Sequence, residues 1–223
     1  MNDPGSEAPE GAVLTPTSSS ATTAAEPFGF ADLVGMARSP SRVLDMVLAE
    51  RPRLAASIAL STAPWTLVAV LVLCTAVASL PYGVVDGWSN AWRVAALYGG
   101  SVLLCWPSLQ VFGAYLGSSL RPLQNLALSL LIASVAALFS LGFAPIVWFL
   151  RATMVNGDWI DGNAVYVVLL AFGLFAGLGQ FSRCVAGHRD LRPFGPAGIL
   201  LLSWQVLVVF VTWRMARALG LVG

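Results

Sequence analysis

The sequence predicts an all-α membrane protein, a five-helix transmembrane bundle with a disordered N-terminal tail and a juxtamembrane amphipathic helix. Of the 223 residues, 57% are hydrophobic and 10% are charged, whereas a soluble globular domain usually has roughly 25% charged residues. The apolar residues form long blocks, and arginines stand between the blocks. Apolar runs of about 20 residues are long enough to cross a bilayer as helices.

The N-terminal tail, residues 1–27, is acidic and rich in Pro, Ser, Thr and Ala. It contains too few apolar side chains to offset the entropy of ordering it, so we expect it to be disordered. It also lacks the basic and apolar regions of a secretory signal. The first span is therefore expected to serve as its own insertion signal.

Residues 28–53 are expected to form a cytoplasmic, interfacial helical segment. Ser39 is suited to cap a helix that begins at Pro40, and this helix should run to about Glu50 before Pro52 ends it. An apolar stripe along this helix, with arginines elsewhere, suits a helix lying on the membrane surface. A helix packed against the cytoplasmic ends of the spans is equally compatible with the pattern.

The transmembrane domain is assigned to residues 54–223. Its first span should close at Pro81, and the third is long enough, at ~42 Å, to exceed the ~30 Å hydrocarbon core. The third span must therefore tilt, kink or continue past the interface, and Pro145 is the natural place for a kink. The expected spans are residues 54–80, 94–116, 123–150, 163–181 and 193–213.

The arginines indicate the orientation of the chain in the membrane. Eight of them lie on the side of the N-terminus: Arg38, Arg42, Arg51, Arg53, Arg121, Arg183, Arg189 and Arg192. Four lie on the other side: Arg93, Arg151, Arg214 and Arg217. This asymmetry predicts a cytoplasmic N-terminus and an external C-terminus. The use of Arg without Lys is typical of GC-rich bacterial genes, so we expect the bacterial cytoplasmic (inner) membrane.

Aromatic residues mark the external interface. Trp and Tyr concentrate where a membrane protein meets the lipid headgroups, so one half of an aromatic belt is expected there. The expected members are Tyr82, Trp88, Trp92, Trp148, Trp159 and Trp213.

The spans hold no ionisable acid, base or histidine, so the sequence predicts a protein that is not an enzyme and has no cofactor or metal. The single histidine, His188, lies in a loop and is expected to be an ordinary interfacial residue. Asp158 and Asp161 could form an external acidic pair, but solvated turn residues are the favoured interpretation. The net charge of +1 gives no reason to expect nucleic acid as a partner.

Uncharged polar residues and prolines within the spans are the candidates for a polar lining. Helix breaks can create binding sites in transporters, yet Ser, Thr and Gln more often bond between helices or to their own backbone. Packing is therefore favoured over a pore, and both remain open. The candidates are Pro64, Thr66, Pro107, Ser108 and Gln110.

Two pairs of glycines have the spacing that lets helices approach closely. Gly113 and Gly117 stand in the second span, and Gly173 and Gly177 stand in the fourth. Close packing inside one molecule is the first interpretation of these glycines, and a homo-oligomer is the second.

The segment 116–124, with its Gly-led loop before a long apolar helix that ends near Pro145, resembles the core of the Yip family (Ypt/Rab-interacting proteins). A Ser39–Pro40 element before five spans is similar to that family's layout. The resemblance implies a non-enzymatic membrane protein that scaffolds or organises other membrane components. Its expected partners are the lipid bilayer and other membrane proteins. The alternative is a small channel or transporter for an uncharged or lipid-like solute.

Overall fold

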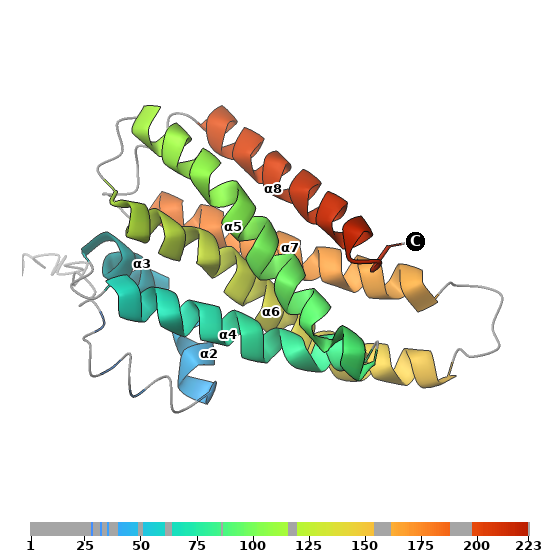
Figure 1. Cartoon of the computed structure of the whole chain (residues 1–223). Helices are drawn as coiled ribbons and strands as arrows, with labels where there is room; N and C mark the ends of the chain where they lie inside the picture. Colours follow the sequence, from blue (N-terminus) through green and yellow to red (C-terminus); the bar gives the residue numbers. More distant parts are fainter. Residues whose placement is uncertain are drawn as a thin grey trace, which may run out of the picture.

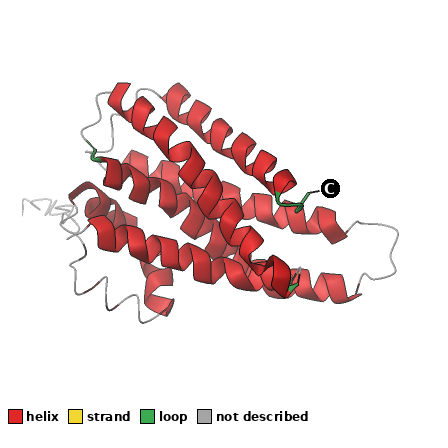
Figure 2. Cartoon of the chain, viewed as in Figure 1, coloured by secondary structure: helices red, strands yellow, loops and turns green. Residues whose placement is uncertain are grey.

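Helices make up most of the part of the chain that the structure describes, with short turns and loops beside them (Figure 2). The computed structural model describes Phe28, Asp32, Gly35 and residues 40–48, 51–60, 64–85, 87–115, 120–153, 162–187 and 198–222. Five helices within these ranges are long and apolar enough to cross a membrane. The predicted class, an all-α protein with five transmembrane helices, is thereby confirmed. The expected disordered tail lies outside the described residues.

The spanning helices run alternately in opposite directions (Figure 1). They are α4 (Pro64–Val84), α5 (Ala91–Tyr115), α6 (Pro122–Thr153), α7 (Gly162–Gly187) and α8 (Gly198–Ala218). Shorter helices are α2 (Pro40–Leu48), α3 (Arg51–Leu60) and the 3-10 turn η1 (Trp88–Asn90). We call the end of the bundle where α4 begins the Pro64 end, and the opposite end the Trp88 end.

The central helix of the bundle is α6, which packs against α4, α5 and α7, while α8 packs against α5 (Figure 1). Every residue from 127 to 137 is buried, on all faces of α6. A helix that is apolar all round belongs in the interior of a bundle. At 32 residues, α6 extends over ~48 Å, so it is longer than the hydrocarbon core is thick.

The first apolar block differs from the expected single span over residues 54–80. It divides into α3 and α4, and the spanning helix begins at Pro64. Proline is favoured at the first position of a helix, where its missing N–H would have no helical partner. The sequence does not reveal this division, because the residues on both sides of Pro64 are apolar.

Prolines inside helices do not end them here. Pro81 lies within α4, which continues to Val84, so the expected closure of the first span at Pro81 is wrong. Pro107 lies within α5, and Pro145 lies within α6. Each removes one backbone hydrogen bond, and packing against neighbouring helices offsets this loss in membrane proteins.

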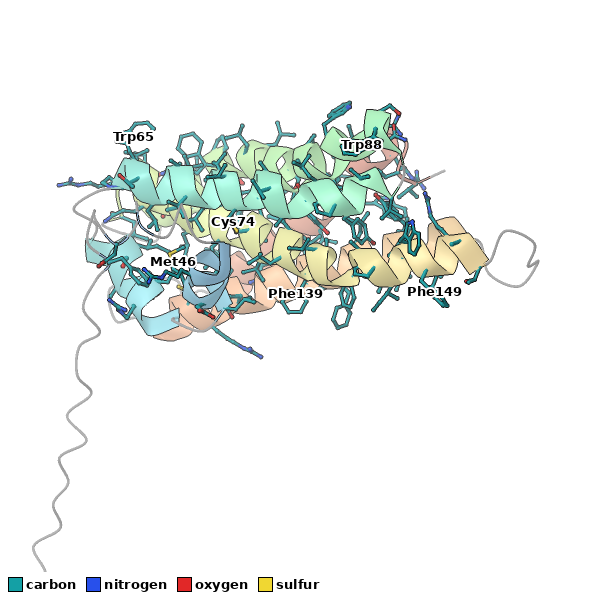
Figure 3. The ribbon with its side chains drawn as sticks, turned by 90° about the horizontal axis from the view of Figure 1, so that it is seen from below. Met46, Trp65, Cys74, Trp88, Phe139 and Phe149 are labelled. Carbon is teal, nitrogen blue, oxygen red and sulfur yellow. The ribbon has the colours of Figure 1, made fainter. Side chains whose placement is uncertain are left out.

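Helix α2 packs against the bundle, contacting α3 and α6. Its side chains Met46 and Val47 are fully buried, and Figure 3 shows α2 with Met46 beside the spanning helices. The Gln180 side chain on α7 donates a hydrogen bond from Nε2 to the Val47 carbonyl oxygen at 3.3 Å. Of the two placements open from the sequence, the structure therefore shows the helix packed against the spans.

Tryptophans stand exposed at both ends of the bundle. Figure 3 shows Trp65 and Trp88 at opposite ends, both pointing away from the helices, with exposed fractions of 69% and 84%. Trp92, Trp148 and Trp213 are exposed as well. Aromatic side chains at these positions suit the two membrane interfaces.

Tyr82 was expected in the aromatic belt, and this expectation is wrong. The side chain is fully buried, its ring stacks on Tyr166 with centroids 4.8 Å apart, and its hydroxyl donates to the Tyr166 carbonyl oxygen at 2.9 Å. Buried Tyr hydroxyls usually find such a partner. Tyr82 therefore joins α4 to α7. Trp159 lies outside the described residues.

Candidate functional site

The candidate lining residues of the first two spans occupy different environments. Pro64 and Thr66 are half-buried in the first turn of α4, at the Pro64 end. Pro107 is exposed, so it faces away from the interior of the bundle. A residue on the lipid-facing side of its helix does not line an interior path.

Two side chains donate hydrogen bonds to one backbone carbonyl oxygen near Pro107, that of Cys105. Ser108 donates its hydroxyl to the Cys105 carbonyl oxygen at 2.6 Å. Trp204 of α8 donates Nε1 to the same oxygen at 3.2 Å, and its buried ring contacts Phe181 at a centroid distance of 5.2 Å. Ser108 thus bonds within its own helix, and Trp204 fastens α8 to α5.

Two side-chain amides have buried atoms that make no hydrogen bond with any described residue. They are Nε2 of Gln110, near the end of α5, and Oδ1 of Asn125, near the start of α6. Both lie towards the Pro64 end, where α5 ends and α6 begins. Burying an unmatched donor or acceptor is costly, so these amides are the polar atoms most suited to meet a solute or a water molecule.

A chain of hydroxyl groups joins three helices in the middle of the bundle. Ser140 of α6 and Tyr98 of α5 have their hydroxyl oxygens 2.7 Å apart, and Tyr98 donates to the Leu170 carbonyl oxygen of α7 at 3.1 Å. Because Tyr98 has one hydroxyl proton, Ser140 is the donor between the two. Sequence reasoning missed this junction, although a Tyr inside an apolar block signals a need for a buried partner.

A second pair of hydroxyls joins α4 to α6. The Thr75 and Ser134 hydroxyl oxygens lie 3.1 Å apart, and each is within hydrogen-bond distance of the Leu71 carbonyl oxygen, at 2.9 and 3.0 Å. Since each hydroxyl has one proton, at most two of these three bonds form at a time. All these atoms are buried. The polar groups therefore satisfy one another between helices.

The glycines of the fourth span lie against α6. A methyl group added at Gly173 would stand 2.9 Å from the Ala136 carbonyl oxygen and 3.2 Å from the hydroxyls of Ser140 and Tyr98. One added at Gly177 would stand 2.5 Å from the Ile132 carbonyl oxygen. Both glycines thus mediate packing inside the molecule. Gly113 is buried in α5, and Gly117 lies outside the described residues.

An apolar groove of about 780 Å³ opens between the ends of α4 and α6 at the Trp88 end. We call it the tryptophan groove. Ala91 and Ala144, both buried, form its floor, and Val85 and Gly87 of the turn after α4 also line it. Its other sides include Leu80, Pro81, Val84, Trp88, Pro145 and Trp148.

Acidic, histidine and cysteine side chains do not cluster in the described ranges in any group of three or more that could hold a metal ion. Cys74, Cys105 and Cys184 are separate, buried free thiols. His188, Asp158 and Asp161 lie outside the described residues.

No protein-family model matches the chain, and neither a curated protein nor a solved structure matches it.

Proposed function

We propose that this chain is a non-enzymatic integral membrane protein that scaffolds or organises other membrane components. The observation that carries the proposal is the use made of the polar side chains inside the spans. The Tyr98 hydroxyl meets that of Ser140, and the Thr75 hydroxyl meets that of Ser134. Tyr98 and Ser134 also donate to backbone carbonyls of neighbouring helices. Groups used in this way hold helices together, as interhelical hydrogen bonds do in other membrane proteins.

The outward faces of the helices also support the proposal. Large apolar side chains on three different helices face away from the bundle, among them Leu104 of α5, Val168 of α7 and Phe210 of α8. These faces are available to lipid and to the spans of other proteins. The resemblance of segment 116–124 to the Yip family agrees with such a role. We place the protein in the bacterial inner membrane, with a cytoplasmic N-terminus.

Photo-crosslinking in the native membrane tests this function. A photoreactive amino acid is placed singly at Leu104, Val168 and Phe210, and at the buried Leu131 as a matched control. If the protein is a scaffold, the exposed positions that face its partner are expected to crosslink reproducibly to one protein, and Leu131 is expected to crosslink to none. Crosslinks to lipid alone from every exposed position would overturn the proposal.

The second candidate function, a channel or transporter for an uncharged solute, is favoured by one observation. The buried, unmatched amide atoms of Gln110 and Asn125 lie near the same end of adjacent helices. Solute flux into proteoliposomes, compared between wild type and Gln110→Leu, tests this alternative. Flux above that of protein-free vesicles that disappears in Gln110→Leu would establish it and displace the scaffold proposal.

A further inference from the structure

The tryptophan groove is held in shape by contacts at its edges. At Gly83 of α4 a methyl group would collide with the Ala91 backbone, so the end of α4 and the start of α5 lie in direct contact. Arg151 of α6 donates Nη1 to the carbonyl oxygen of Val85 at 3.3 Å. Tyr82, next to Gly83, is bonded to α7. These contacts fix the two helices that form the walls, so the groove exists before anything enters it.

The shape of the groove suits a thin, flexible chain better than a helix. Its floor consists of the small side chains Ala91 and Ala144, whereas its rim carries Trp88 and Trp148, with exposed fractions of 84% and 63%. Helices that associate in membranes need small residues at the contact, because their backbones approach closely. Two exposed indoles at the rim hinder the close approach of a second helix to the floor, whereas an acyl chain is thinner than a helix, which is about 10–12 Å across.

The position of the groove in the membrane sets the chemistry of its occupant. The residues that line the groove come from the last turns of the spanning helix α4, from the turn and η1 that follow it, and from the spanning helices α5 and α6. Tryptophan prefers the level of the lipid headgroups, so Trp88 and Trp148 place the mouth of the groove at the interface and its apolar floor beside the acyl chains. The surrounding medium there is phospholipid.

We infer that the tryptophan groove binds one acyl chain of a membrane phospholipid, seated over Ala91 and Ala144 and flanked by the two tryptophans. This inference goes beyond the scaffold function and does not depend on it. Close packing of the chain against fixed walls distinguishes this lipid from the mobile lipids around the other faces.

The experiment uses the full chain in detergent micelles with a phosphatidylglycerol that carries a diazirine in one acyl chain. Adducts are mapped by mass spectrometry as the lipid concentration is raised. The variant Val84→Phe fills the groove from its half-buried wall, and Val77→Phe, on the same helix and facing lipid, is the matched control. Ala144→Phe fills the groove from its floor and serves as a second variant.

Wild type and Val77→Phe are expected to give saturable adducts concentrated on residues 80–88 and 141–148. Val84→Phe and Ala144→Phe should lower those adducts by about threefold or more, since a phenyl ring takes the volume of the chain. Adducts spread over all exposed apolar positions, or an unchanged yield in a correctly folded Val84→Phe, would overturn the inference. With a photoreactive amino acid at Val84 in place of the labelled lipid, a crosslink to a second copy of the chain would assign the groove to that copy and overturn the inference.

Discussion

Tyr98 stands between Ser140 and Leu170, accepting a hydrogen bond from the Ser140 hydroxyl at 2.7 Å and donating one to the Leu170 carbonyl oxygen at 3.1 Å. One side chain of α5 thereby connects α6 and α7. Gly173, one turn from Leu170, leaves the space in which the two hydroxyls meet. The hydroxyl pair and the close approach of α7 to α6 therefore lie at the same point of the bundle.

Replacing Tyr98 by Phe removes the hydroxyl and keeps the ring. We expect the free energy of unfolding to fall by about 1 kcal/mol, because Ser140 loses its acceptor and the Leu170 carbonyl loses a donor. Unfolding in mixed micelles of mild detergent and dodecyl sulfate measures the change. Tyr115→Phe, at an exposed position at the end of the same helix, is the control and should be neutral. Equal effects of the two substitutions would contradict a structural role for the Tyr98 hydroxyl.

Two glycines of α7, Gly177 and Gly179, differ in the space around them. Gly177→Ala should destabilise the bundle by about 1–3 kcal/mol, because its methyl group would press on the Ile132 backbone. Gly179→Ala adds a methyl group that meets nothing within 4 Å, so it should be neutral or stabilising by up to about 1 kcal/mol. Thermal unfolding in detergent distinguishes the two variants. Destabilisation by both would show that α7 packs in a different rotation.

The bond between α8 and α5 depends on Trp204. Trp204→Phe keeps an aromatic ring against Phe181 but removes the donor to the Cys105 carbonyl oxygen, so a loss of about 1–2 kcal/mol is expected. The exposed Trp92 provides the matched control, Trp92→Phe. Hydrogen exchange should rise in α8 and near Cys105 in the first variant only. Unchanged exchange there would mean that the apolar contacts alone hold α8.

Gln180 holds α2 against the spans through the Val47 carbonyl oxygen. Gln180→Met keeps most of the side-chain volume but removes the donor, and amide exchange over residues 40–48 should then increase. Exchange in α4 should stay as in wild type. Gln205→Met, which removes a bond from Gln205 Nε2 to the Ser182 hydroxyl, is the control and should leave α2 protected. Equal protection of α2 in both variants would show that Met46 and Val47 suffice to hold it.

The five spans could be predicted from the sequence because bilayer thickness sets the length of each apolar run. The division at Pro64 could not, because residues 54–80 are apolar on both sides of that proline. Tyr82 was misplaced because a Tyr near the end of a span is typical of the membrane interface. Only the packing of the helices shows that its side chain is turned inward.

The polar junctions were harder to predict than the spans. Thr75 stood out in the sequence as a polar residue, but its pairing with Ser134 depends on how α4 and α6 are rotated about their axes. The tryptophan groove likewise depends on the distance between two helix ends. Neither the rotation of the helices nor the distance between their ends can be derived from the order of residues in a single sequence.

The central claim is that polar side chains in the spans join helices and do not line a water-filled path. The native cysteines test it directly, because Cys74 is adjacent to Thr75 and Cys105 lies beside Pro107, and both thiols are buried. The measurement is the rate at which a charged, membrane-impermeant thiosulfonate labels the wild-type protein in open membrane fragments, read by mass spectrometry of peptides that separate Cys74, Cys105 and Cys184. We expect no labelling of either cysteine until denaturant is added. Rapid labelling of Cys74 or Cys105 in the native membrane would show water beside these polar residues and contradict the claim.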